Sequence, residues 1–197
     1  MTTSQDDIDY AQIQLNEARR RVESVEDRIT EIEVESNIGY LNTKSDEISF
    51  TPEEVPEEHK EEVVLRNKTE FTEIKGHIQN MIIDCQMCIE MSVKSMFKLV
   101  GDNFDYSHGI SFSSGHTKNF YYNIPSGFGR HEDIVRSIFL TQFWESFYEL
   151  AKYGAPELNV GPQTIFNESD AERALNDAKF CVNLAEDMLE YAEQELV

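Results

Sequence analysis

The sequence is poor in the residues that interrupt helices, with 9 glycines and 5 prolines among 197 residues. Many-turned β folds need such residues at their turns, so their scarcity favours long helices. The sequence also lacks an apolar run close to the roughly 18 residues that a membrane-spanning helix requires. We therefore expect a helical protein without a membrane partner.

Cysteine is scarce as well, and its count of 3 is odd. This argues against a disulfide framework and favours a reducing compartment. The N-terminus has neither the basic nor the apolar region of a signal peptide, which predicts a cytoplasmic protein. Cys85 and Cys88 form a C-x-x-C, but no second pair exists to complete a zinc site. Their position inside a predicted helix favours small buried side chains over redox chemistry, and we expect no metal or cofactor.

Basic residues are also few: 17 Lys and Arg against 38 Asp and Glu give a formal net charge of −21. Such a surface repels phosphate backbones, which disfavours nonspecific binding to nucleic acid. The acidity has two interpretations, a halophilic protein adapted to a salt-rich cytoplasm or an ordinary acidic protein. We favour the halophilic one, and thermal stability measured against KCl distinguishes them.

A long N-terminal helix is the clearest pattern. Within residues 5–35, apolar residues recur three or four positions apart and form one stripe, which must pack on a partner chain or on later helices (Ile8, Ala11, Leu15, Ala18, Val22, Val25, Ile29 and Ile32). Residues 36–50 lose this periodicity and are predicted to form a connector between two helices. Thr51–Glu54 has the residues of a helix cap, and a second helix is expected from near Pro56 or Asn67 to Val100. Gly101 suits a left-handed helix end.

The second half predicts a long irregular loop, about 101–129, followed by two helices. The helix over 131–153 has an apolar face so wide that it predicts burial on more than one side or at a subunit interface, and Gly154 ends it. A capping box at Ser169–Glu172 begins the last helix. With 40% hydrophobic residues, the chain predicts one all-α domain over 1–197. Its expected architecture is an antiparallel up-and-down bundle of four to five helices.

The segment "DCQMCIEMSVKSMFKLVG" (84–101) resembles the second helix of HEPN domains (higher eukaryotes and prokaryotes nucleotide-binding), with Glu90, Lys94 and Gly101 at the family's Glu, Lys and Gly positions. "YSHGI", which contains His108, is similar to the segment that follows in the family. Lys152 and Tyr153 occupy a turn like the one before its final helix. The resemblance covers about 70–195, and the helix at 5–35 would supply a lengthened first helix.

The resemblance implies a helical bundle that dimerises. Many HEPN proteins are ribonucleases with an Arg-x4–6-His motif near the end of the third helix, and "FWESFYELAKYG" contains neither residue. This departure predicts a noncatalytic module that forms a homodimer and binds a partner protein or a nucleotide-like ligand. The expected partner is of nucleotidyltransferase type, in a toxin–antitoxin or defence system. Two alternatives stay open: a divergent HEPN ribonuclease acting on RNA, and a coiled-coil structural adaptor that works through 5–35.

The candidate binding residues lie in three stretches of the sequence. Glu90 and Lys94 are four residues apart, as in a helical ion pair, and could form a polar edge of a groove or a simple surface pair. His108, Arg130 and His131 lie in or beside the predicted loop and could replace the missing phosphate site. Lys152 and Tyr153 complete the set, and no catalytic residue is assigned.

Overall fold

The computed structural model describes residues 3–45, 57–101, 110–113 and 115–195, with the backbone alone over 31–45 and 57–77. Within these ranges the chain is helical and contains no strand, which confirms the all-α prediction. None of the described helices is both long enough and apolar enough to cross a membrane. The elements are α1 (Gln5–Ser45), α2 (Glu57–Leu99), α3 (Gly115–Asn123), α4 (His131–Tyr153), the 3-10 turns η1 (Pro156–Leu158) and η2 (Pro162–Thr164), and α5 (Glu168–Glu195).

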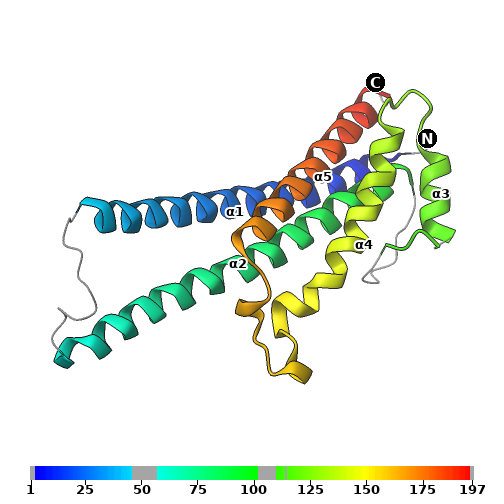
Figure 1. Ribbon diagram of the computed structural model, residues 1–197. Coiled ribbons are helices and arrows are strands. Elements are labelled where there is room, and N and C mark those ends of the chain that lie inside the picture. The colour runs from blue at the N-terminus through cyan, green and yellow to red at the C-terminus, as the bar shows by residue number, and fades with distance from the viewer. Residues whose placement is uncertain (1–2, 46–56, 102–109, 114, 196–197) are drawn as a thin grey trace.

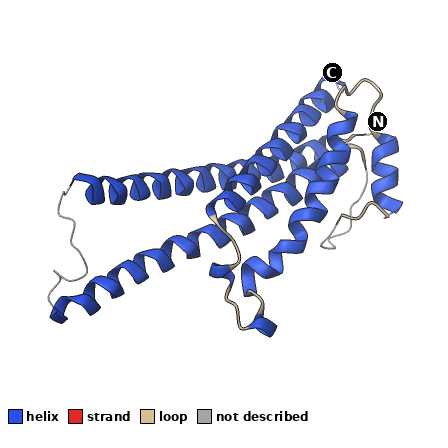
Figure 2. Cartoon of the chain, viewed as in Figure 1, coloured by secondary structure: helices blue, strands red, loops and turns tan. Residues whose placement is uncertain are grey.

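Four long helices form the bundle, and successive long helices run in opposite directions (Figure 1). α2 packs against α1, α4 and α5, and α5 also packs against α1. The far end of α1 and the start of α2 extend beyond α4 and α5 as a helical hairpin (Figure 1). The short α3 stands beside the beginning of α4, at the same end of the molecule as both chain termini (Figures 1 and 2).

The apolar stripe predicted on the first helix packs against other helices of the same chain. Its described members, from Ile8 to Ile29, are buried against α2 and α5. Apolar residues also recur at helical spacing on α2 and α5, and most of those described are buried, which leaves the centre of α2 enclosed by three helices. Among the described side chains of α2, from 78 onward, the fully inaccessible ones are Met81, Ile82, Cys85, Cys88, Ile89, Val93, Met96, Phe97 and Leu99, together with Ser92 and Ser95.

One carboxylate joins α1 to α2 at the side of this core. Asp84 accepts hydrogen bonds from Arg21 at 2.8 Å and from Arg28 at 2.6 Å, one on each carboxylate oxygen. All three side chains are mostly shielded from solvent, so these ion pairs are less screened than surface pairs. The spacing of seven residues between the arginines places both on the same side of α1, where it faces α2.

The start of α1 is tied to the end of α2. Ser4 and Asp7 cap α1 reciprocally: the Ser4 N–H donates to Asp7 Oδ2 at 3.1 Å, and the Asp7 N–H donates to Ser4 Oγ at 3.3 Å. Asp7 Oδ1 also pairs with Lys98 at 3.2 Å, and the Thr3 hydroxyl donates to the Leu99 carbonyl at 2.6 Å. Thr3, which immediately precedes the capping residue of α1, therefore satisfies a free carbonyl in the last turn of α2.

One predicted boundary in the first half needs correction. Residues 36–45 were predicted to connect, but the backbone continues as helix to Ser45. The loss of apolar periodicity there reflects the change of surroundings beyond the bundle, not a loss of helical backbone. The predicted cap at Thr51–Glu54 lies outside the described residues, and α2 begins at Glu57, close to the first of the two starts considered.

The predicted irregular loop contains a helix. α3 occupies Gly115–Asn123, and its Phe120 ring stacks on Phe97 of α2 with 4.0 Å between ring centroids. Ile110, Ile124 and Phe128 are buried in the same cluster. The aromatic residues of this region thus cover the end of the core, and tertiary packing stabilises a helix too short to persist alone.

Glycines end two helices as predicted. Gly101 has φ 79° after α2, and Gly154 has φ 75° after α4. A side chain at Gly154 would also meet the Val160 carbonyl oxygen at 2.4 Å, so this turn requires glycine twice over. The start of α5 differs from expectation, because Asn167 and Asp170 form the reciprocal cap, at 3.2 and 3.0 Å, in place of Ser169 and Glu172.

The capping carboxylate of α1 predicts a pH-dependent stability. Partial burial opposes ionisation of Asp7, but hydrogen bonds from Ser4 and the Lys98 charge outweigh it and lower its pKa below 3.8. A lowered pKa stabilises the folded state above the unfolded pKa, and this stability is lost as pH falls through the folded value. We expect D7N to lower the free energy of unfolding by about 1 kcal/mol at pH 7. Urea denaturation should show this difference shrinking below about pH 4.

The exposed Asp6 in the same turn provides the matched control. D6N should leave the unfolding midpoint nearly unchanged at pH 7 and below about pH 4, since Asp6 does not cap the helix. A D7N difference that stays constant from pH 7 to pH 3 would contradict the role given to the Asp7 charge.

Candidate functional site

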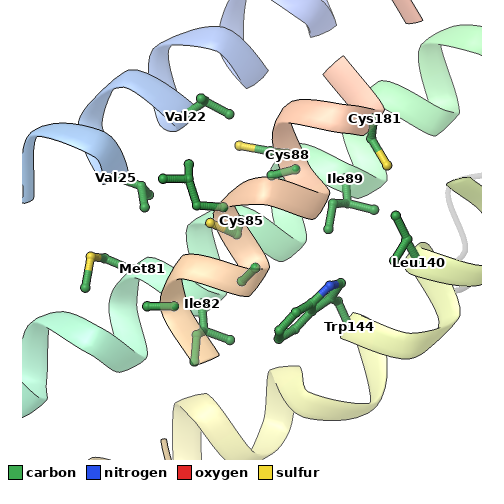
Figure 3. Close-up of a cluster of buried hydrophobic side chains, with 14 of the residues drawn as sticks. Val22, Val25, Met81, Ile82, Cys85, Cys88, Ile89, Leu140, Trp144 and Cys181 are labelled. Carbon is green, nitrogen blue, oxygen red and sulfur yellow. The ribbon is translucent and has the colours of Figure 1, made fainter. Parts of the chain in front are cut away.

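The three cysteines lie in the core and are not disulfide-bonded (Figure 3). Cys85 and Cys88 come from α2 and Cys181 from α5, among Val22, Ile82 and Trp144 (Figure 3). The Cys88 thiol donates to the Ala18 carbonyl at 3.3 Å, which links α2 to α1. Burial raises the pKa of Cys85 well above its ordinary value and that of Cys88 to about 12. These thiols therefore act as small apolar groups, as the sequence predicted.

Glu90 and Lys94 form the predicted ion pair, with 2.6 Å between Lys94 Nζ and Glu90 Oε1. Gln86 adds a hydrogen bond to Glu90 Oε2 at 3.0 Å. The pair is not the exposed surface pair considered from the sequence, because the side chains are only 14% and 19% exposed. These residues form a partly buried polar patch on α2, which strengthens their attraction relative to a surface pair.

Arg130 and His131 lie where α4 begins. Arg130 Nε donates to Asp133 at 2.7 Å, and its Nη1 donates to Asp187 of α5. Partial burial opposes its charge, but these hydrogen bonds outweigh it and raise the pKa of Arg130. The guanidinium also lies over the Phe180 ring. Arg130 therefore joins α4 to α5, and its carboxylate partners occupy donors that a phosphate would need.

The remaining described candidates make contacts of their own. His131 packs edge-on against Tyr121 of α3, with 6.4 Å between ring centroids, and His108 lies outside the described residues. Lys152 and Tyr153 are at the opposite end of α4, about 33 Å away at 1.5 Å per residue. There the exposed Lys152 lies over the rings of Tyr148 and Tyr153. The predicted residues thus form separate groups and not one site.

A different feature stands out on α4. Phe139, Phe143 and Phe147 are four residues apart, and their rings contact in sequence at 5.8 and 5.1 Å between centroids. We call these three residues the Phe strip. Phe143 and Phe147 are half-buried against Trp144 and Phe166, whereas Phe139 is 43% exposed. The wide apolar face predicted for this helix is therefore only partly covered within the chain.

Two arginines lie over the Phe strip. Arg136 is 5.2 Å from the Phe139 ring centroid, and Arg173 of α5 is 5.5 Å from that of Phe143. Asp177 accepts the Trp144 indole N–H at 3.0 Å and lies 3.5 Å from Arg136. Cations at these distances from ring faces are attracted to them. The arrangement is an aromatic surface bearing positive charge, on a protein whose net charge is −21.

Sequence reasoning found part of this feature. It recognised the wide apolar face of 131–153, but it did not select Arg173. The four-residue spacing of the phenylalanines was a usable signal, because it places them along one side of a helix. Arg173 lies on another helix, and nothing in the sequence shows which ring it approaches.

The described side chains contain no group of three or more His, Cys, Asp or Glu residues arranged to hold a metal ion. Comparisons with protein-family models, with curated proteins and with solved structures find no match to this chain. The function must therefore be inferred from the chemistry of the chain's own residues.

The burial of the cysteines predicts that they resist alkylation and disulfide exchange in the folded protein. At pH 8 a thiol with a pKa of about 12 is ionised in about one molecule in ten thousand, and only the thiolate reacts. We expect Ellman's reagent to detect almost no thiol in native buffer. In guanidinium chloride the same reagent should detect all 3. Reaction of any cysteine in the native protein at the rate of free cysteine would show that the core around α2 is open.

Proposed function

We propose that this protein is a noncatalytic helical module that binds a partner protein. The observation that carries the proposal is the Phe strip: a long helix of the bundle keeps apolar and cationic side chains at the surface, on a face that the described elements cover only in part. Apolar surface rimmed by polar groups is typical of protein interaction sites.

The contacts of Arg130 support the noncatalytic part of the proposal. A ribonuclease needs a cation available for phosphate and an imidazole placed to move a proton. Arg130 already binds Asp133 and Asp187, and its neighbour His131 packs on Tyr121. Two carboxylates beside the guanidinium would also repel an approaching phosphate. This geometry favours a structural role for the Arg130–His131 pair over the ribonuclease alternative.

The packing of α1 bears on the adaptor alternative. An adaptor working through 5–35 would need its apolar stripe available to another chain. The described part of that stripe is buried against α2 and α5 of the same chain. We therefore favour a bundle that presents a surface over a coiled coil that exchanges partners.

The HEPN resemblance adds an oligomeric state, a type of partner and a class of ligand to the proposal. Noncatalytic HEPN modules resemble this chain in the order of their helices, and they too lack the Arg-x4–6-His motif. On this basis the proposal includes a homodimer, and a partner of nucleotidyltransferase type in a toxin–antitoxin or defence system. A nucleotide-like ligand belongs to the same proposal, with Glu90 and Lys94 as its polar contacts.

Incubation of the purified protein with total RNA, together with its expression in growing cells, tests this function. We expect intact RNA and normal growth, because Arg130 is held by carboxylates. A metal-independent ribonuclease serves as the positive control, and R130A serves as the specificity control. RNA cleavage by the wild type that R130A abolishes would overturn the noncatalytic proposal.

A further inference from the structure

The surface around the Phe strip is an apolar feature of α4 that the described elements of the bundle leave partly open. Val135 is 40% exposed and Phe139 43% exposed, whereas their neighbours Ile134 and Ile138 are buried in the core. Positions 135, 139, 143 and 147 repeat every four residues, so together they form a ridge along one side of α4. The half-buried rings of Phe143 and Phe147 extend this ridge towards α5.

The arginines on this ridge have unused hydrogen-bonding capacity. A guanidinium has five N–H donors. Among the described residues, Arg136 reaches a carboxylate only at 3.5 Å, and Arg173 has no carboxylate within 4.0 Å. Arginine over an aromatic ring is well placed for a bidentate contact with a carboxylate. An acidic group arriving at this surface would therefore find donors that the chain itself does not occupy.

Electrostatic repulsion indicates whether the ridge binds a second copy of this chain or a different partner. Two copies paired about a two-fold axis through the ridge would align Phe139 of each copy with Phe147 of the other, with Phe143 on the axis. Arg173 lies over Phe143, so this pairing would bring two Arg173 guanidiniums together at the centre. Like charges at the centre of an interface destabilise it. The net charge of −21 opposes a polyanion such as nucleic acid more strongly than a short segment that carries only a few carboxylates. A protein segment bearing carboxylates fits both the rings and the arginines.

We propose that the Phe strip, together with Arg136 and Arg173, is the docking surface for an acidic amphipathic helix of a partner protein. Apolar side chains of that helix cover Val135 and the three rings, and its carboxylates bind the two guanidiniums. This is recognition of an amphipathic helix through its apolar face, on a surface formed by α4 and by Arg173 of α5. The inference rests on the proposed function, since it names the surface and the chemistry of the partner.

Trp144 makes the proposal measurable without a label. It is the only tryptophan of the chain, it is buried, and its ring contacts Phe143 and Phe147 with centroids 5.2 and 5.7 Å away. A helix seated on the ridge would change the surroundings of these rings, and with them the tryptophan fluorescence. The probes are two synthetic peptides of about 18 residues, or five helical turns. Both carry Leu at every third or fourth position, and they differ only in having Glu or Lys on the flanks.

We expect the glutamate peptide to change Trp144 fluorescence saturably and to bind at least about ten-fold more tightly than the lysine peptide. F139S and R173E should each weaken the glutamate peptide about ten-fold, and R173E should gain affinity for the lysine peptide. Matched controls are I13S, which removes an exposed apolar side chain from α1, and K118E, which reverses an exposed charge on α3. Both controls should bind like the wild type. Thermal melting of each variant checks the fold.

Three results would overturn the inference. The first is equal affinity for the two peptides, or no binding of the glutamate peptide at millimolar concentration. The second is unchanged binding by F139S and R173E. The third is a dimer, seen by light scattering, that F139S dissociates, because it would assign the ridge to a second copy. None of these results produces RNA cleavage, so failure of this inference is distinguishable from failure of the proposed function.

Discussion

The enclosure of α2 by three other helices is the constraint on which the rest of the structure depends. Its segment from Met81 to Phe97 contributes side chains to both core clusters, and those facing α1, α4 and α5 are fully inaccessible. A helix buried on several sides needs small residues where neighbours approach closely, and Cys88, Ser92 and Ser95 meet that need. Their polar atoms bond to backbone carbonyls of α1 or of α2 itself. The thiols therefore serve as small packing groups, and they stay protonated because ionising a buried group is costly.

The enclosure of α2 also explains which side of α4 is exposed to solvent. One side of α4 contributes Ile134, Ile138, Leu140 and Trp144 to the core. The opposite side has no further layer to pack against among the described elements, yet it retains Val135 and Phe139. Arg130 and Asp177 hold α4 to α5 through polar contacts. The result is a firmly held helix that offers aromatic rings and guanidinium groups on its outer side, which is the basis of the proposed docking surface.

Apolar spacing was sufficient to predict the long helices and most of their buried residues, and Gly101 and Gly154 marked two helix ends. It could not predict that helix continues to Ser45, because backbone conformation persists where the apolar stripe stops. It also missed α3, whose nine residues depend on Phe120 reaching Phe97. At α5 two overlapping capping signatures competed, and Asn167 with Asp170 formed the cap. The candidate site was harder still. Arg173 meets Phe143 across two helices, a contact that only the packed bundle defines.

Amide hydrogen exchange tests most directly whether enclosure of α2 organises the molecule. Protection reports the free energy of the opening that exposes each amide. The account predicts that amides from Met81 to Phe97 exchange slowest, through global unfolding alone, and that D7N accelerates them by the same factor as its loss of stability. Amides of α3, from Gly115 to Asn123, should exchange earlier through local opening. Exchange of the Met81–Phe97 amides as fast as those of α3 would contradict the central place given to α2.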